Sequence, residues 1–332
     1  MKTKRRHRRI IGKYIGKEKG PMLICIGGMH GNEPAGVEAV DMMVKMLEVE
    51  PITNPDFEFK GAFLGLSGNL NALKQGVRFV DRDLNRMWTL DTVDRILASR
   101  REDLINEERE IFDLLRIIRR EIKSYQPEQV VILDLHTTTA FGGIFTITTD
   151  DPVSIRIGAE LHTPVITGML KGIRGPSLHY FNAQNFGLPM SCVVFESGQH
   201  NETLSINRAI AAITNTMSII GCVNVDHVEN QHEQLLIEYA KGLPKVAEHI
   251  MTHPIQPGDE FRMEPGYSNF QSVHKGELLA HDKHGPIYAM DDGLILMPLY
   301  QKQGDDGFFL IKEILSHGEP IHQLWESTQR VN

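Results

Sequence analysis

The sequence has few cysteines and no long hydrophobic run, and each absence excludes a class of protein. Its three cysteines, Cys25, Cys192 and Cys222, are too few and too widely spaced for a disulfide framework or a CxxC zinc site. This cysteine content indicates a reducing compartment. The longest apolar stretch, near residues 209–223, is interrupted by a Thr-Asn-Thr run and is too short to cross a bilayer. The sequence therefore predicts neither a disulfide-rich secreted domain nor a membrane protein.

Basic residues are scarce outside the first nine positions. Those nine positions hold six of the 35 Lys and Arg residues and no acidic residue, so the remaining chain has 29 basic and 43 acidic residues, a net charge of −14. An acidic body disfavours nucleic acid as a partner. No apolar segment of the signal-peptide type follows the basic run, so we expect a cytoplasmic protein. The run itself is expected to be a solvated tail or part of an edge strand.

The chain does contain a regular alternation of short apolar runs and amphipathic segments. The apolar runs predict buried strands at residues 22–26, 57–66, 129–135 and 191–196. Helical patterns lie between and after them, at residues 35–48, 100–124 and 206–223. Strands that alternate with helices predict an α/β fold, with a mixed sheet flanked by helices.

The pattern changes in the last quarter of the chain. After a helical segment near residues 232–240, the sequence consists of short β-like pieces separated by turn signals. We therefore predict an α/β catalytic domain over residues 1–244 and a smaller β-rich domain over residues 245–332.

Imidazole and carboxylate side chains stand where three predicted strands end. His30 and Glu33 follow the first strand, His136 follows the strand at 129–135, and Glu196 ends the strand at 191–196. In open α/β sheets ligands bind at the carboxyl ends of strands. Two imidazoles and one carboxylate leave a coordination position open for water, as in catalytic zinc sites, with Glu196 as a separate general base. The same ligand set also holds ferrous iron in oxygenases, but the α/β context favours zinc hydrolysis.

Arginines cluster in the segment RFVDRDLNR, residues 78–86. Arg78, Arg82 and Arg86 suit the bidentate capture of a carboxylate or an oxyanion. The alternative is a salt-bridged loop, in which Asp81 and Asp83 neutralise these arginines locally.

Four motifs in this order, GGMHGNEPAG, RFVDRDLNR, DLHTTT and FESG, resemble the succinylglutamate desuccinylase/aspartoacylase family, a branch of the zinc carboxypeptidase-like fold. They cover residues 27 to about 199, and the β-rich tail resembles the family's C-terminal domain more loosely. The resemblance implies one zinc ion per chain, held by His30, Glu33 and His136.

The same resemblance implies roles for four further residues. Glu196 acts as general base and then general acid, and Arg78 polarises the scissile carbonyl. Asn85 and Arg86 hold the α-carboxylate of the substrate. Asp134, two residues before His136 on the same strand face, is expected either to contact that imidazole or to cap a neighbouring backbone group.

The sequence departs from the aspartoacylase pattern at two places. Aspartoacylases have an arginine about ten residues before the catalytic glutamate, whereas residues 182–189 contain none and Arg174 is the nearest. Near the C-terminus, Phe308 and Phe309 occupy the region of a substrate-facing tyrosine. Both departures disfavour N-acetylaspartate as the substrate.

We therefore predict a zinc-dependent hydrolase that cleaves the amide bond of a small N-acyl amino acid or a related amide. The alternatives are a carboxypeptidase-type metallopeptidase and a non-catalytic zinc-binding member of the fold. The retained general base disfavours the last, because a binding protein needs none. The expected partner is a small molecule, without nucleic acid or membrane, and the sequence is compatible with a homo-oligomer.

Overall fold

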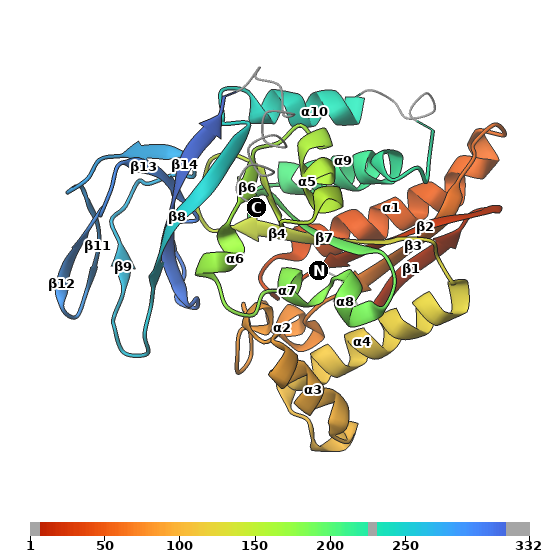
Figure 1. Ribbon diagram of the computed structural model, residues 1–332, viewed down its shortest axis with the longest axis horizontal. Helices are drawn as coiled ribbons and strands as arrows, with labels where there is room; N and C mark the ends of the chain where they lie inside the picture. Colours follow the sequence, from red (N-terminus) through yellow and green to blue (C-terminus); the bar gives the residue numbers. More distant parts are fainter. Residues whose placement is uncertain (1–6, 225–230, 317–332) are drawn as a thin grey trace, which may run out of the picture.

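The computed structural model describes residues 7–224 and 231–316, and within them a large twisted sheet lies between two layers of helices (Figure 1). The strands are β1 (Ile10–Ile15), β2 (Glu18–Gly27), β3 (Lys60–Ser67), β4 (Val130–Thr138), β5 (Phe145–Thr148), β6 (Val165–Thr167), β7 (Met190–Gln199), β8 (Val246–Pro254), β9 (Arg262–Met263), β10 (Gln271–Val273), β11 (Leu278–Asp282), β12 (Gly285–Tyr288), β13 (Gly293–Leu296) and β14 (Asp306–Leu315). The helices are α1 (Pro34–Thr53), α2 (Leu70–Gln75), α3 (Leu90–Ala98), α4 (Asn106–Tyr125), α5 (Pro152–Glu160), α6 (Met169–Gly172), α7 (Ser177–Tyr180), α8 (Ala183–Phe186), α9 (Leu204–Ile219) and α10 (Gln231–Ala240).

The centre of the sheet is made of the parallel strands β3, β2, β4 and β7. Their side chains alternate between the two helical layers. Leu23 and Cys25 of β2 join the core under α1 and α9, whereas Met22, Ile24 and Ile26 join the core on the α4 side. Because both faces are covered, these strands are apolar throughout, and this is why they were predictable as continuous hydrophobic runs.

The sheet is mixed because antiparallel strands flank its parallel centre. β1 pairs with β3 in the antiparallel direction at one edge, and β5 pairs with β7 in the same way. The predicted fold class, a mixed sheet flanked by helices with a β-rich C-terminal part, is confirmed.

The segment between β4 and β7 contains structure that the sequence did not reveal. It forms β5, β6 and the helices α5–α8, of which three have only four residues. Such short helices provide little periodicity to detect. The helix predicted at 100–124 begins later, at Asn106, because residues 101–103 form a separate 3₁₀ turn and Ile105 is extended.

The C-terminal region continues the large sheet. β8 starts at Val246, next to the predicted change of pattern, and pairs in parallel with β6, with Val165 opposite Val246. β14, β13 and β10 extend the sheet further, and β12, β11 and β9 form a separate small antiparallel sheet (Figure 1). The division into domains at residues 244 and 245 stays a prediction.

The end of the basic run differs from a solvated tail. Arg9 is partly buried, and its guanidinium donates to the carbonyl oxygens of Ser67 and Gly68 and to Glu110. The edge strand β1 begins only after the run, at Ile10, and residues 1–6 lie outside the described residues. Among the helices of the described ranges, none combines the length and the hydropathy needed to span a membrane.

Candidate active site

The first motif forms the loop between β2 and α1. Glu33 is the last residue before α1, whose first residue is Pro34. The loop approaches other backbone so closely that only glycine fits at Gly31, where a Cβ atom would lie 2.1 Å from the Ala72 carbonyl carbon. Gly28 has a φ of +71°, which also favours glycine. These glycines allow the chain to turn sharply and to direct His30 and Glu33 toward the carboxyl end of the sheet.

His136 and Glu196 lie side by side on neighbouring parallel strands. They are register partners between β4 and β7, and their side chains are 3% and 6% exposed. Both line the same pocket as His30 and Glu33. The expected convergence at the strand ends is therefore present.

Glu33 joins the two imidazoles. Its Oε1 lies 2.8 Å from His30 Nδ1 and its Oε2 lies 3.0 Å from His136 Nδ1. The Thr137 backbone N–H also donates to Oε2, at 3.0 Å. One ligand atom from each of these three residues lies within 4.8 Å of the other two, and this spacing suits a single metal ion.

The far nitrogen of each imidazole faces a buried carboxylate. His30 Nε2 lies 3.1 Å from Asp83 Oδ1, and His136 Nε2 lies 3.3 Å from Asp134 Oδ1. Ser177 Oγ donates to the other oxygen of Asp134, at 2.6 Å. Carboxylates in this position fix the orientation of metal-binding histidines and increase their basicity. Asp134 contacts the imidazole, as the first of its two expected roles requires. The contact between Asp83 and His30 was not predicted.

Burial and charge act in opposite directions on these groups. Burial disfavours the ionised form of Glu33, but His30 and His136 outweigh it and hold the pKa of Glu33 well below its usual value. Burial likewise disfavours the charged form of His136, but Asp134 and Glu33 raise its pKa well above its usual value. The group thus attracts positive charge strongly.

Glu196 behaves differently from Glu33. Burial raises the pKa of Glu196 to about 8, and repulsion from Glu33 contributes in the same direction. Its Oε2 is buried without a hydrogen-bond partner among the described residues. Such a carboxyl group can accept and return a proton near neutral pH.

The arginine-rich segment lies beside this group. Arg78 donates from Nε and Nη2 to Asp83 Oδ2, at 2.9 Å each, and its Nη1 lies 3.7 Å from Glu33 Oε1. Asn85 Oδ1 accepts a hydrogen bond from the Ser177 backbone N–H at 2.8 Å. Arg86 pairs with Asp306 of β14. The local salt-bridge alternative thus holds for Arg78 and Asp83, whereas Arg86 takes its partner from the C-terminal region.

A buried carboxylate of α4 shapes the arginine-rich loop. Glu107 accepts hydrogen bonds from the backbone N–H groups of Val80, Asp81 and Arg82, at 2.7, 3.1 and 3.3 Å. It also accepts a bond from Asn69, the residue that caps α2. Glu107 is 2% exposed, and it fixes the loop that carries Arg78 although it does not itself reach the pocket.

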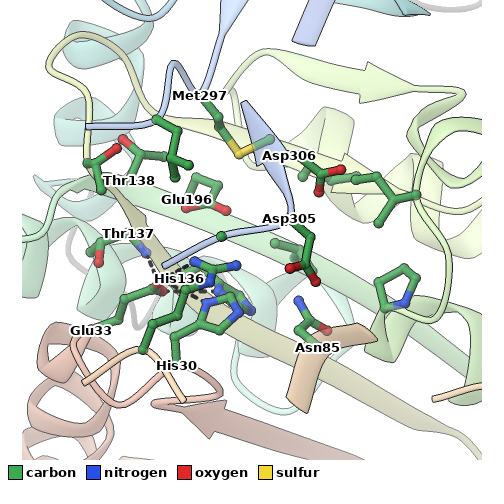
Figure 2. Close-up of a pocket in the computed structure, with 18 of the residues that line it drawn as sticks. His30, Glu33, Asn85, His136, Thr137, Thr138, Glu196, Met297, Asp305 and Asp306 are labelled. Carbon is green, nitrogen blue, oxygen red and sulfur yellow. Dashed lines mark hydrogen bonds and ion pairs between the residues drawn. The ribbon is translucent and has the colours of Figure 1, made fainter. Parts of the chain in front are cut away.

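All seven predicted site residues line one pocket of about 100 Å³. One wall is apolar and includes Met169, Leu170, Ile173 and Leu178. The segment 297–306, which connects β13 to β14, closes another side (Figure 2). In Figure 2 the carboxylates of Glu196 and Asp305 lie above the group formed by His30, Glu33 and His136.

Two glutamines connect the segment 297–306 to the loops that carry Asn32 and Arg78. Gln301 Oε1 accepts from Asn32 Nδ2 at 2.7 Å. Gln303 accepts from the Arg78 backbone N–H and donates to the Phe79 carbonyl, at 3.1 Å in both bonds. Sequence reasoning missed this segment, because contacts across more than 220 residues leave no local signal.

Phe308 and Phe309 lie on opposite faces of β14. Phe309 lines the pocket. Phe308 points to the opposite side of β14, where it is buried and stacks on His253 at 5.1 Å between ring centroids. Only Phe309 is placed to contact a substrate.

Comparison with known proteins supports the resemblance. Residues 19–218 match the family model of the succinylglutamate desuccinylase/aspartoacylase catalytic domain. The chain belongs to this family. A probable aspartoacylase from Nostoc sp. is 31% identical over 41% of this chain and 42% of its own length. A succinylglutamate desuccinylase from Pseudomonas fluorescens is 33% identical over 22% of this chain and 20% of its own length. The matches thus cover less than half of these curated relatives.

Solved structures show that the family's fold extends over most of this chain. The succinylglutamate desuccinylase from Vibrio cholerae has a TM-score of 0.58 at 18% identity and covers 89% of this chain and 82% of its own. The product-bound ectoine utilization protein EutE (DoeB) from Ruegeria pomeroyi has a TM-score of 0.59 at 18% identity, over 89% and 86% of the two chains. At this identity the likeness establishes the fold, and the C-terminal strands are part of it.

Proposed function

We propose that this member of the family is a zinc-dependent hydrolase that cleaves the amide bond of a small N-acyl amino acid or a related amide. The observation that carries the proposal is the buried His30–Glu33–His136 group with the unpartnered Glu196 carboxylate in the same pocket. Metal ligands alone would suit a binding protein. A buried proton acceptor beside them favours catalysis.

The donor set fits zinc. Two imidazoles and one carboxylate leave a fourth position for water or substrate, and zinc in such a site acts as a Lewis acid toward water and a carbonyl group. His30 and His136 would bind through Nδ1, because their Nε2 atoms face Asp83 and Asp134. The carboxylates of Glu33, Asp83 and Asp134 bring negative charge that would balance the charge of a divalent cation.

The remaining side chains supply proton transfer and positioning. Glu196 takes a proton from the attacking water and delivers it to the amine that leaves. Arg78, held by Asp83, donates to the carbonyl oxygen as negative charge develops on it. Asn85 keeps its amide NH₂ group for the substrate carboxylate, since its Oδ1 is engaged with Ser177. Arg86, the other residue that the family resemblance assigns to this carboxylate, is paired with Asp306 and therefore contributes less to its binding.

A small substrate is favoured over a polypeptide. The segment 297–306 lies across the pocket and is hydrogen-bonded to the loops of Asn32, Arg78 and Phe79. A peptide chain that entered the pocket would have to displace this segment. The carboxypeptidase-type alternative is therefore less suited to this pocket. The cytoplasmic location and a homo-oligomeric state stay predictions.

Metal analysis combined with a substrate screen tests the proposal. Purified protein should hold about one zinc per chain, and the double variant His30→Ala, His136→Ala should hold almost none. Zinc-loaded protein should hydrolyse members of a panel of N-acyl amino acids but not peptides. Full zinc retention in the double variant would refute the ligand assignment. Ferrous iron in place of zinc, or hydrolysis of C-terminal peptide bonds, would favour one of the alternatives.

A further inference from the structure

Each cation that lines the pocket already has a carboxylate partner of its own. Arg78 pairs with Asp83, with 2.9 Å between Nη2 and Oδ2. Arg86 pairs with Asp306 at the start of β14. Neither arginine therefore brings uncompensated positive charge to the outer part of the pocket.

Asp305 brings negative charge to the same place. It lines the pocket, and its carboxylate has no hydrogen bond or ion pair to another residue within the described ranges. Figure 2 shows it above Asn85, beside Asp306 and on the same side as Glu196. A second observation, separate from the two aspartates, also marks this pocket as a binding site. The Glu196 Oε2 atom inside it is buried and has no hydrogen-bond partner among the described residues.

A second carboxylate on the substrate would bind weakly in this part of the pocket. It would approach Asp305 and Asp306, and Arg86 is already paired with Asp306. The segment 182–189 supplies no additional arginine. A positively charged group at the same position would instead find Asp305 free, while its aliphatic part contacts the wall formed by Met169, Leu170 and Leu178.

We propose that the outer part of this pocket binds a cationic group of the substrate through Asp305, so that the amine released by hydrolysis is a basic amino acid or a related diamine rather than an acidic amino acid. This inference rests on the proposed amide hydrolysis. It assigns Asp305 as a specificity-determining residue and Asp306 as the residue that withdraws Arg86 from anion binding.

Three ligands of matched length test the charge preference. Nα-acetylornithine, Nα-acetylnorvaline and Nα-acetylglutamate share a short aliphatic side chain and end in a cation, a methyl group and an anion. Their binding is measured by calorimetry on zinc-loaded Glu196→Gln protein, which binds substrate without rapid turnover. Acetylornithine should bind about three- to fivefold more tightly than acetylnorvaline, as for a partly exposed ion pair. Acetylglutamate should bind the most weakly, and added salt should reduce both differences.

Variants of the two aspartates separate their roles. In the same Glu196→Gln background, Asp305→Asn should bring the ornithine-to-norvaline ratio close to one. Asp306→Asn should release Arg86 and improve the binding of acetylglutamate relative to acetylnorvaline. Asp291→Asn, at an exposed acidic residue just before β13 that does not line the pocket, removes the same charge and should leave both ratios unchanged.

The outcomes for this inference and for the proposed function differ. Equal binding of the three ligands, a preference for acetylglutamate, or an unchanged ratio in Asp305→Asn would overturn the inference. Turnover is followed separately, with wild-type protein and all three ligands in competition. If the binding order holds but no ligand is hydrolysed, the charge preference stands and the proposed hydrolysis fails.

Discussion

At Glu196 the protein keeps a carboxyl group away from water and leaves one of its oxygens without a partner. Such burial costs free energy, and a side chain selected only for stability would be paired or replaced by an apolar residue. Glu33, only a short distance away, is ionised by two imidazoles. Two neighbouring carboxyl groups thus have opposite pKa shifts, and this contrast fits the proposed roles of Glu33 as a metal ligand and Glu196 as a proton carrier.

Replacing Glu196 with glutamine tests this separation of roles. The glutamine keeps the shape of the side chain but cannot accept a proton, so turnover should fall by about a hundredfold to ten-thousandfold. Zinc content should remain near that of the wild type, because Glu196 is not expected to be a ligand. The measurements are metal stoichiometry and kcat on a substrate found in the screen.

A matched control for this prediction is Glu58→Gln, an exposed glutamate that precedes β3 and does not line the pocket. It should change neither quantity. Loss of zinc in Glu196→Gln would make Glu196 a ligand, and normal turnover with normal zinc would place the base elsewhere.

At the scale of elements, α4 holds several segments around the site in place through its carboxylates. It carries three buried glutamates, each of which binds a different segment. Glu107 binds the loop at 80–82, Glu110 binds Arg9, and Glu121 binds Lys13 of β1, with 2.7 Å between Oε2 and Nζ. A helix that presents three carboxylates in this way connects the edge strand, the arginine-rich loop and the core.

Removal of the Glu107 carboxylate should loosen the loop that carries Arg78. In Glu107→Ala the three backbone N–H groups lose their buried acceptor, at a cost of about 1–3 kcal/mol in the free energy of unfolding. Hydrogen exchange of the Val80, Asp81 and Arg82 amides should become faster, and kcat should fall because Arg78 is no longer held in place. Glu107→Gln, which keeps one acceptor oxygen, should retain part of the amide protection and part of the kcat.

The neighbouring Glu108 provides the control for this prediction. It lies one position further along α4 and pairs with the half-exposed Arg95 on the surface. Glu108→Ala should leave amide exchange at residues 80–82 unchanged. Fast exchange in both variants would mean that the loop responds to the helix in general and not to the Glu107 carboxylate.

The Glu121–Lys13 contact should make stability depend on pH. Burial alone would raise the pKa of Glu121, but hydrogen bonds from Lys13 and Arg120 lower it below 4.5. A carboxylate whose pKa is lower in the folded state stabilises that state above the unfolded pKa, and the contribution is lost as the pH falls through the folded pKa. Glu121→Gln should therefore cost about 0.5 kcal/mol near pH 7 and less near pH 4. Urea denaturation of both proteins at the two pH values measures this.

A double-mutant cycle with Lys13→Met assigns this effect to the pair. The coupling energy between the two positions should be present near pH 7 and decrease on acidification. A coupling energy that does not change with pH would show that packing, and not charge, connects the edge strand to α4.

The sequence predicted those elements whose signal is local. The apolar runs of β2, β4 and β7 and the long helices α1, α4 and α9 were evident because each is long and buried in a regular pattern. His30 and Glu33, in the loop after β2, could be found for the same reason. So could His136 and Glu196, near the C-terminal ends of β4 and β7. The pairing of Arg86 with Asp306 depends on a contact across 220 residues, so no local pattern could reveal it.

At the scale of the whole molecule, one hydrophobic core crosses the predicted domain boundary. Phe270, Phe309 and Ile311 of the C-terminal region belong to the same buried cluster as Phe145 and Ile166. Phe145 and Phe270 meet edge to face, with 5.7 Å between ring centroids. The pocket draws side chains from both regions, so the C-terminal strands support the site as well as the sheet.

This shared core predicts that the regions on the two sides of residue 245 unfold together. β8 pairs with β6 on one side and with β14 on the other, and loss of either region would expose apolar side chains of the other. Hydrogen exchange of peptides from β4 and β14, measured across a urea series, should give the same midpoint. A fragment of residues 1–244 should fail to give a sharp unfolding transition, because the β6 edge and its apolar neighbours would be uncovered. Two separate midpoints, or a fragment that unfolds as cooperatively as the whole chain, would show instead that the C-terminal region is an independent unit and that the shared core contributes little to the stability of the catalytic part.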